Sequence, residues 1–93
     1  MKGENVNDLF RMVKERVPLR EAARRFGLEA SPAGMVRCPF HEDHIPSLRL
    51  YDDHFYCFGC HAHGDAVDLV VRLTGCRPIE AARVLAEEFS LDI

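Results

Sequence analysis

Two short segments hold the residues best suited to bind a metal ion. Cys38 and His41 lie three positions apart in C-P-F-H, and Cys57 and Cys60 have the same spacing in C-F-G-C, after fifteen intervening residues. Two ligands on one tight turn can point at the same ion, and a second such turn completes a tetrahedron. Thiolate and imidazole ligands favour zinc, because calcium and magnesium prefer oxygen. Four protein ligands leave no position for an activated water, so we expect one structural zinc ion and no catalytic residue here.

Alternative chemistry for these cysteines fits the sequence less well. A thioredoxin-type redox pair at Cys57 and Cys60 would need a βαβ unit, which the sequence pattern lacks. Two disulfides would leave His41 without a role, and the first residues contain no apolar stretch typical of a secretory signal. We therefore expect a reducing compartment, the cytoplasm. No apolar run approaches the roughly 18–20 residues that a membrane span needs.

Five histidines compete for the single imidazole position. His63 is the main rival to His41 under the spacing rules for zinc ligands. His61 directly follows Cys60, and two adjacent residues rarely reach the same ion. The remaining candidates are predicted to be ordinary surface or core residues: His44 and His54 at the surface, and Cys76 as a small buried hydrophobic residue.

Length and charge limit what the chain can do. Its 93 residues have room for one domain, and a domain this small is expected to need a stabilising metal. Residues 1–37 carry eight Lys or Arg against five Asp or Glu, residues 38–65 carry one against five, and the net charge is −3. Attraction for phosphate must therefore come from a local patch. No nucleophile–base pair or acidic catalytic cluster is evident, so we expect no enzymatic activity from this chain alone.

Hydrophobic periodicity predicts helices at both ends of the chain and short strands between them. Pro18 is expected to open the second helix and Gly27 to end it, with Leu28 folding back on its last turn. Asp65 is expected to cap the third helix, which Gly75 ends. The predicted helices cover roughly residues 7–16, 18–26, 66–74 and from 78 onward, and the predicted strands cover residues 35–38, 47–51 and 55–57.

These elements predict an α+β fold in which a small antiparallel zinc-ribbon sheet is flanked by N- and C-terminal helices. Asn7 and Asp8 are expected at the cap and first turn of the first helix, whose apolar stripe begins at Val6. Residues 52–54 are expected to form the turn between the last two strands. We expect one domain over residues 1–93, with helices in 1–34, the zinc ribbon in 35–64 and further helices in 65–93.

The alternation of side chains along the strands predicts a polar outer face on the sheet. Leu48, Leu50, Phe55 and Cys57 are expected to face the core. Arginine interleaved with tyrosine on an exposed surface is typical of single-strand binding, because bases stack on rings and phosphates contact cations. An ordinary amphipathic sheet surface would show the same alternation. The residues predicted to contact DNA on the outer face are Arg37, Arg49, Tyr51 and Tyr56.

The segment CPFHEDHIPSLRLYDDHFYCFGCHAHGDAVDLV resembles the N-terminal zinc-binding domain of bacterial and phage replicative DNA primases of the DnaG type. Those domains share C-P-F-H, a P-S turn before a strand, an aromatic residue leading into C-F-G-C, and a following glycine and helix. The ending TGCRPIEAARVLAEEFSLDI is similar to theirs, so the resemblance covers roughly residues 35–93, while residues 1–30 match poorly. It implies four zinc ligands at the matching positions: Cys38, His41, Cys57 and Cys60.

The resemblance also implies a function. In that family the zinc domain helps to recognise the single-stranded template, a separate polymerase domain joins the nucleotides, and a third domain contacts the replicative helicase. We therefore expect a zinc-dependent DNA-binding module for primer synthesis in DNA replication, with a single-stranded DNA template and a primase polymerase domain or replicative helicase as partners. The polymerase domain is expected to be absent from this chain, which would be a primase fragment or a free-standing module, such as one encoded on a mobile element.

Three features depart from the family pattern. The hairpin between Leu50 and Phe55 is slightly shorter than usual. His44 and Ile45 stand where relatives commonly have a basic residue before the P-S turn, which weakens the expected attraction for DNA. The glycines that usually follow the last ligand are replaced at two positions: His61 and His63.

Functions of other classes are alternatives to template recognition. Residues 18–28, PLREAARRFGL, resemble the first helix of a helix-turn-helix, but the next stretch leads into a strand instead of a recognition helix. The other alternative is a free-standing zinc-ribbon regulator or protein-docking module of a phage or mobile element, with the helical ends as its contact surface.

Overall fold

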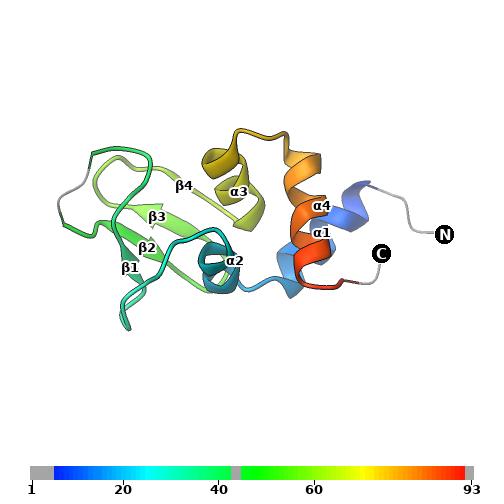
Figure 1. Cartoon of the computed structure of the whole chain (residues 1–93), viewed down its shortest axis with the longest axis horizontal. Coiled ribbons are helices and arrows are strands. Elements are labelled where there is room, and N and C mark those ends of the chain that lie inside the picture. Colours follow the sequence, from blue (N-terminus) through cyan, green and yellow to red (C-terminus); the bar gives the residue numbers. More distant parts are fainter. Residues whose placement is uncertain (1–5, 43–44, 92–93) are drawn as a thin grey trace.

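The computed structural model describes residues 6–42 and 45–91, and it has four helices and a four-stranded sheet within them (Figure 1). Two helices precede the sheet and two follow it, so the predicted α+β class is confirmed. The helices are α1 (Val6–Arg16), α2 (Leu19–Arg25), α3 (Ala66–Thr74) and α4 (Pro78–Glu88). The strands are β1 (Met35–Val36), β2 (Leu48–Leu50), β3 (Phe55–Cys57) and β4 (His63–Gly64).

The sheet is antiparallel throughout, with its strands in the order β1-β2-β3-β4. Arg49 pairs with Tyr56, and Tyr56 pairs with His63, so these three residues form a row across the sheet. Strand β4 was not predicted, because two residues are too few to show an alternating pattern. The first two strands are shorter than predicted, since the chain leaves the sheet after Val36 and joins it again only at Leu48.

The predicted end of α2 is confirmed, and its start is shifted by one residue. Gly27 has φ +92°, and its N–H donates to the carbonyl of Arg24 at 3.1 Å. The N–H of Leu28 donates to the carbonyl of Ala23 at 2.9 Å, which is the reversed hydrogen bonding of a glycine-terminated helix. Pro18 has an extended backbone and lies at the cap position, not inside the helix.

Helix α3 begins and ends where the sequence predicts. The Asp65 carboxylate accepts from the N–H of Asp68 at 3.0 Å, and the Asp68 carboxylate accepts from the N–H of Asp65 at 3.0 Å. This reciprocal pair forms a capping box, which fixes the first turn directly after β4. Gly75 adopts the left-handed conformation at the C-terminal end, with φ +79°.

Helix α1 differs from expectation at its beginning. The helix already includes Val6, so Asn7 lies inside the first turn and is not the cap, while Asp8 lies in the first turn as predicted. Val6 is 48% exposed, so the buried stripe of this helix starts at Leu9. The residue before Val6 lies outside the described part of the chain.

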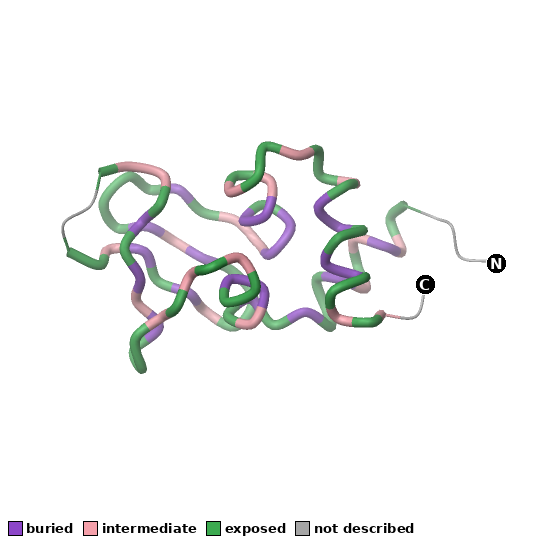
Figure 2. The backbone as a smooth tube through the Cα atoms, viewed as in Figure 1, coloured by how far each residue is buried: buried purple, intermediate pink, exposed green. Residues whose placement is uncertain are grey.

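One continuous core connects the sheet to the helices. Figure 2 shows buried stretches along the strands and on the facing sides of α3 and α4. Helix α1 contacts α3 and α4, and α3 also contacts α2 and β4. The inner face of the sheet is the predicted one, because Leu48, Leu50, Phe55 and Cys57 are all fully buried. As expected, α2 leads into β1 and not into a recognition helix. Within the described ranges, no helix combines the length and apolar character needed to cross a bilayer.

Candidate metal centre

The first pair of candidate ligands lies on a turn that follows β1. Cys38 is buried and comes two residues after the end of that strand, and His41 is half-buried. The backbone N–H of Phe40 donates to Sγ of Cys38 at 3.4 Å, so the turn wraps around the sulfur. Such N–H donation stabilises a thiolate, the form in which cysteine binds metals.

The second pair lies on a turn that leaves β3. Cys57 is the last residue of the strand and is fully buried, whereas Cys60 is exposed. Sγ of Cys57 accepts from the N–H groups of Gly59 at 3.3 Å and Cys60 at 3.4 Å. The hydroxyl of Ser47 lies 3.5 Å from the same sulfur. Ser47 was not predicted to support the site, because only the fold brings it next to Cys57.

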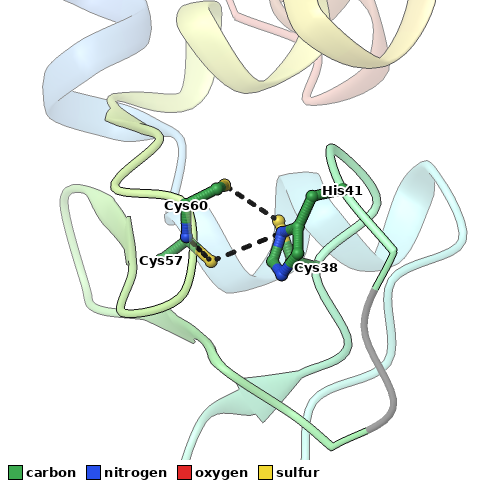
Figure 3. Close-up of side chains that lie close together, drawn as sticks. All are labelled: Cys38, His41, Cys57 and Cys60. Carbon is green, nitrogen blue, oxygen red and sulfur yellow. Dashed lines mark hydrogen bonds between the residues drawn. The ribbon is translucent and has the colours of Figure 1, made fainter.

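The two turns face each other and bring the four predicted ligands together (Figure 3). Sγ of Cys38 lies 3.7 Å from Sγ of Cys60, and Sγ of Cys57 lies 4.0 Å from Nδ1 of His41. All four ligand atoms lie within 4.8 Å of one another. A tetrahedral zinc ion with Zn–S bonds of about 2.3 Å would separate its sulfurs by about 3.8 Å. The geometry therefore fits zinc without a large rearrangement.

The protonation of the cysteines also fits a cation. Burial alone would raise the pKa of the Cys57 thiol, but hydrogen bonds from the Ser47 hydroxyl and from the N–H groups of Cys60 and Gly59 outweigh it and lower the pKa to about 6. Burial, and secondarily the neighbouring sulfurs, raises the pKa of the Cys38 thiol to about 12. The thiolate of Cys57 is thus stable here, and deprotonation of Cys38 needs a positive charge beside it. A zinc ion supplies that charge, because coordinating thiols are deprotonated outright.

The close approach of the two turns depends on Gly59. A Cβ atom at this position would lie 2.9 Å from Nε2 of His41 and 3.2 Å from Oγ of Ser47. The role of Gly59 in the structure is steric, because a side chain here would force His41 or Ser47 to shift.

Helix α3 braces the first turn through Phe40. The Phe40 ring lies 6.0 Å from the ring of the buried Phe55. The guanidinium carbon of Arg72, on α3, lies 5.3 Å from the centre of the Phe40 ring. A cation over an aromatic face is attracted by the ring quadrupole. No sequence pattern predicts this contact, since Arg72 is 32 positions from Phe40 in a different predicted element.

The other described histidines, His54, His61 and His63, are not part of the four-ligand cluster. Within residues 6–42 and 45–91, neither His61 nor His63 belongs to a group that could hold a metal. His63 pairs with Tyr56 across the sheet, and its Nδ1 lies 3.1 Å from the carbonyl of His61. His54 is exposed, as predicted, and its Nδ1 lies 2.7 Å from Asp53. Cys76 is half-buried against the core, and His44 lies outside the described residues.

Two of the predicted DNA-contacting residues, Arg49 and Tyr56, lie on the outer face of the sheet, while Arg37 follows β1 and Tyr51 follows β2. Arg37 and Arg49 are exposed, and Tyr51 and Tyr56 are half-buried. The guanidinium carbon of Arg49 lies 4.8 Å from the centre of the Tyr51 ring. Since Arg49 is paired with Tyr56, the sheet places one cation beside two aromatic rings.

Comparisons with known proteins agree with this description. The family model of the CHC2 zinc finger matches residues 3–93. The chain is 33% identical over 88 residues to the DNA primase of Myxococcus xanthus, covering 92% of this chain and 13% of that protein. It is 38% identical over 58 residues to the DNA primase of Chlamydia trachomatis, covering 60% of this chain and 10% of that protein.

A solved structure shows the same fold. The zinc-binding and RNA polymerase domains of the Aquifex aeolicus primase superpose with a TM-score of 0.78 at 25% identity, over 99% of this chain and 23% of that one. The chain thus spans only a small part of the primases that it matches. The family model begins at residue 3 and the solved structure covers 99% of this chain, so the resemblance extends beyond the expected limit at residue 35. The chain belongs to the CHC2 zinc-finger family of DnaG-type primases.

Proposed function

We propose that Cys38, His41, Cys57 and Cys60 hold one structural zinc ion, and that the domain built around it binds single-stranded DNA template during primer synthesis by a primase. The convergence of four ligand atoms within 4.8 Å, from two turns far apart in sequence, carries the zinc assignment. Three thiolates and one imidazole are a common donor set for structural zinc. All four positions are then filled by protein, so the ion stabilises the fold and activates no water.

The outer face of the sheet is the DNA-contacting surface in this proposal. Among the residues that the structure describes, the arginines that form ion pairs with carboxylates do not include Arg37 or Arg49. Their charges are therefore available to phosphates. Tyr51 and Tyr56 lie on the same face, where the ring of Tyr56 is offered to unpaired bases, as single-strand binding requires, and the ring of Tyr51 lies against Arg49.

The basic residues of α2 form an alternative surface for DNA, but each of them already interacts with another residue of the chain. Nε of Arg20 donates to the carbonyl of Leu50 at 3.0 Å. Arg24 forms an ion pair with Glu21 at 2.7 Å. Arg25 forms an ion pair with Glu88 at 2.7 Å, and its guanidinium carbon lies 4.6 Å from the centre of the Phe89 ring. Contacts to phosphate would compete with these interactions, which favours the sheet.

Titration of the zinc-loaded chain with single-stranded DNA, duplex DNA and a replicative helicase tests the proposal. We expect weak, salt-sensitive binding to the single strand, because the net charge of −3 opposes tight association. If replacement of the three α2 arginines abolishes binding while sheet variants bind normally, the proposed surface is wrong. Binding to the helicase without any binding to DNA would support the alternative of a protein-docking module.

The primase polymerase domain is the proposed partner in primer synthesis. The chain matches primases only over their zinc-binding part, so nucleotide joining in this proposal is the work of a polymerase domain elsewhere. Adding the chain to a separately purified polymerase domain should raise the rate of primer synthesis on a natural template. An unchanged rate and unchanged start sites would count against template recognition by this domain.

A further inference from the structure

A cluster of aromatic rings surrounds Tyr56, the middle residue of β3. The ring of Tyr56 lies 5.0 Å from that of Phe58, edge to face. The rings of His61 and His63 lie 6.0 Å and 6.3 Å away, inclined to Tyr56 by 20° and 30°. The two histidine rings are thus inclined by 30° or less to the Tyr56 ring, and the Phe58 ring meets the Tyr56 ring edge to face.

These rings lie on the outer face and contribute little to the core. Tyr56 and His63 are cross-strand partners, so their side chains point to the same face, opposite the buried Phe55 and Cys57. Phe58 is 58% exposed, although burial would stabilise such a side chain. Exposed apolar patches mark interaction sites, and here Phe58 lies next to the half-buried Tyr56.

The backbone of His61 points to the same conclusion. This residue has φ +66°, a left-handed conformation that glycine adopts without strain and that other residues rarely take. Its N–H donates to the carbonyl of Cys57 at 2.9 Å, so this residue closes the second turn. Glycine would adopt the conformation with less strain than histidine. The backbone of His61 is thus consistent with a role for its ring beside Tyr56.

The ring of Tyr51 is stacked more closely than that of Tyr56, whose histidine neighbours lie 6.0 Å and 6.3 Å away. His54 lies 4.3 Å from it with an interplanar angle of 8°, and the Arg49 guanidinium lies 4.8 Å from its centre. A base could contact Tyr51 only by displacing one of these neighbours. Tyr51 is thus better placed to orient Arg49 for phosphates than to stack bases.

We propose that Phe58, His61 and His63 join Tyr56 in a base-stacking platform for single-stranded DNA, while Arg49 and Tyr51 hold the phosphates beside it. Unpaired bases are the required chemistry, because only a base outside a duplex offers its face to a ring. This inference rests on the proposed function and adds three residues to its DNA-contacting surface.

The decisive variants are His61→Gly and His63→Ala, measured with the zinc-loaded chain. The first keeps the backbone conformation and removes only the ring. The probes are a fluorescently labelled single strand of mixed sequence and the same strand with abasic sites, which keeps the phosphates and lacks the bases. Val84→Ala, an exposed apolar position on α4, is the control. Zinc content is measured for every variant.

Each histidine variant should bind the base-bearing strand about 5-fold more weakly, which corresponds to about 1 kcal/mol, the lower end for one stacked base. Binding to the abasic strand and zinc content should stay at the wild-type level. Equal weakening on both strands would show a structural role and overturn the platform, as would wild-type affinity on both. If the unaltered chain binds neither strand, the proposed function itself fails.

Discussion

Replacing Cys60 by serine tests how much a bound metal ion contributes to the free energy of unfolding, apart from the packed core. Cys60 is exposed, so its side chain contributes little to the packed core. Exposed substitutions away from special features usually change the free energy of unfolding by about 0.5 kcal/mol or less. A large loss of stability in Cys60→Ser would therefore have to come through a bound ion.

The expected loss is comparable to the whole stability of the domain. A chain of this size has a free energy of unfolding of about 5–14 kcal/mol. Structural zinc contributes roughly 10–16 kcal/mol of apparent binding free energy at neutral pH. The ligands Cys38 and Cys57 are part of the continuous core, so loss of the ion also removes the metal from two buried sulfurs. We expect Cys60→Ser to lose zinc and its cooperative unfolding transition, and Cys57→Ser to do the same.

Cys76→Ser is the matched control, because it makes the same chemical change at a half-buried cysteine outside the cluster. Thermal unfolding followed by circular dichroism gives the stability, and elemental analysis gives the zinc content. The control should keep one zinc per chain and a transition close to that of the unaltered protein. The reasoning is refuted if freshly purified, folded protein contains no zinc, or if Cys60→Ser unfolds like the control.

Three further predictions concern the fourth ligand, the DNA surface and the brace from α3. His41→Ala should greatly weaken zinc retention in a chelator competition, whereas His63→Ala should change it little; the reverse ranking would move the site to His63. For binding to single-stranded DNA, a plot of log affinity against log salt concentration should have a slope of roughly −1 to −2 for two arginine contacts. Arg49→Ala should lower the affinity and flatten this slope, whereas Tyr56→Ala should lower the affinity and leave the slope unchanged. Arg72→Ala should speed zinc transfer to a chelator about two- to five-fold, the effect of losing a cation–π contact of about 0.5–1 kcal/mol, and an unchanged rate would remove α3 from the support of the site.

The sequence by itself determined the features that depend on near neighbours. The spacing of Cys57 and Cys60 is set within one turn, so the pattern predicts that both can face one ion. The capping of α3 by Asp65 and its end at Gly75 follow from local backbone hydrogen bonding. Alternation along three residues was enough to predict which side of β2 and β3 faces the core, because the pleat has a fixed period of two.

The tertiary structure decided what depends on contacts between distant segments. Spacing left both His41 and His63 as candidates, and the fold brings His41 to the three cysteines while β4 turns His63 to the outer face. The support of Cys57 by Ser47 joins segments ten positions apart, and no local pattern marks it. The sequence shows charge but not its partners. Only the fold reveals that the arginines of α2 are engaged and that, among the residues it describes, Arg49 has no carboxylate partner. Such pairings follow from chain topology, which residue types along the sequence do not specify.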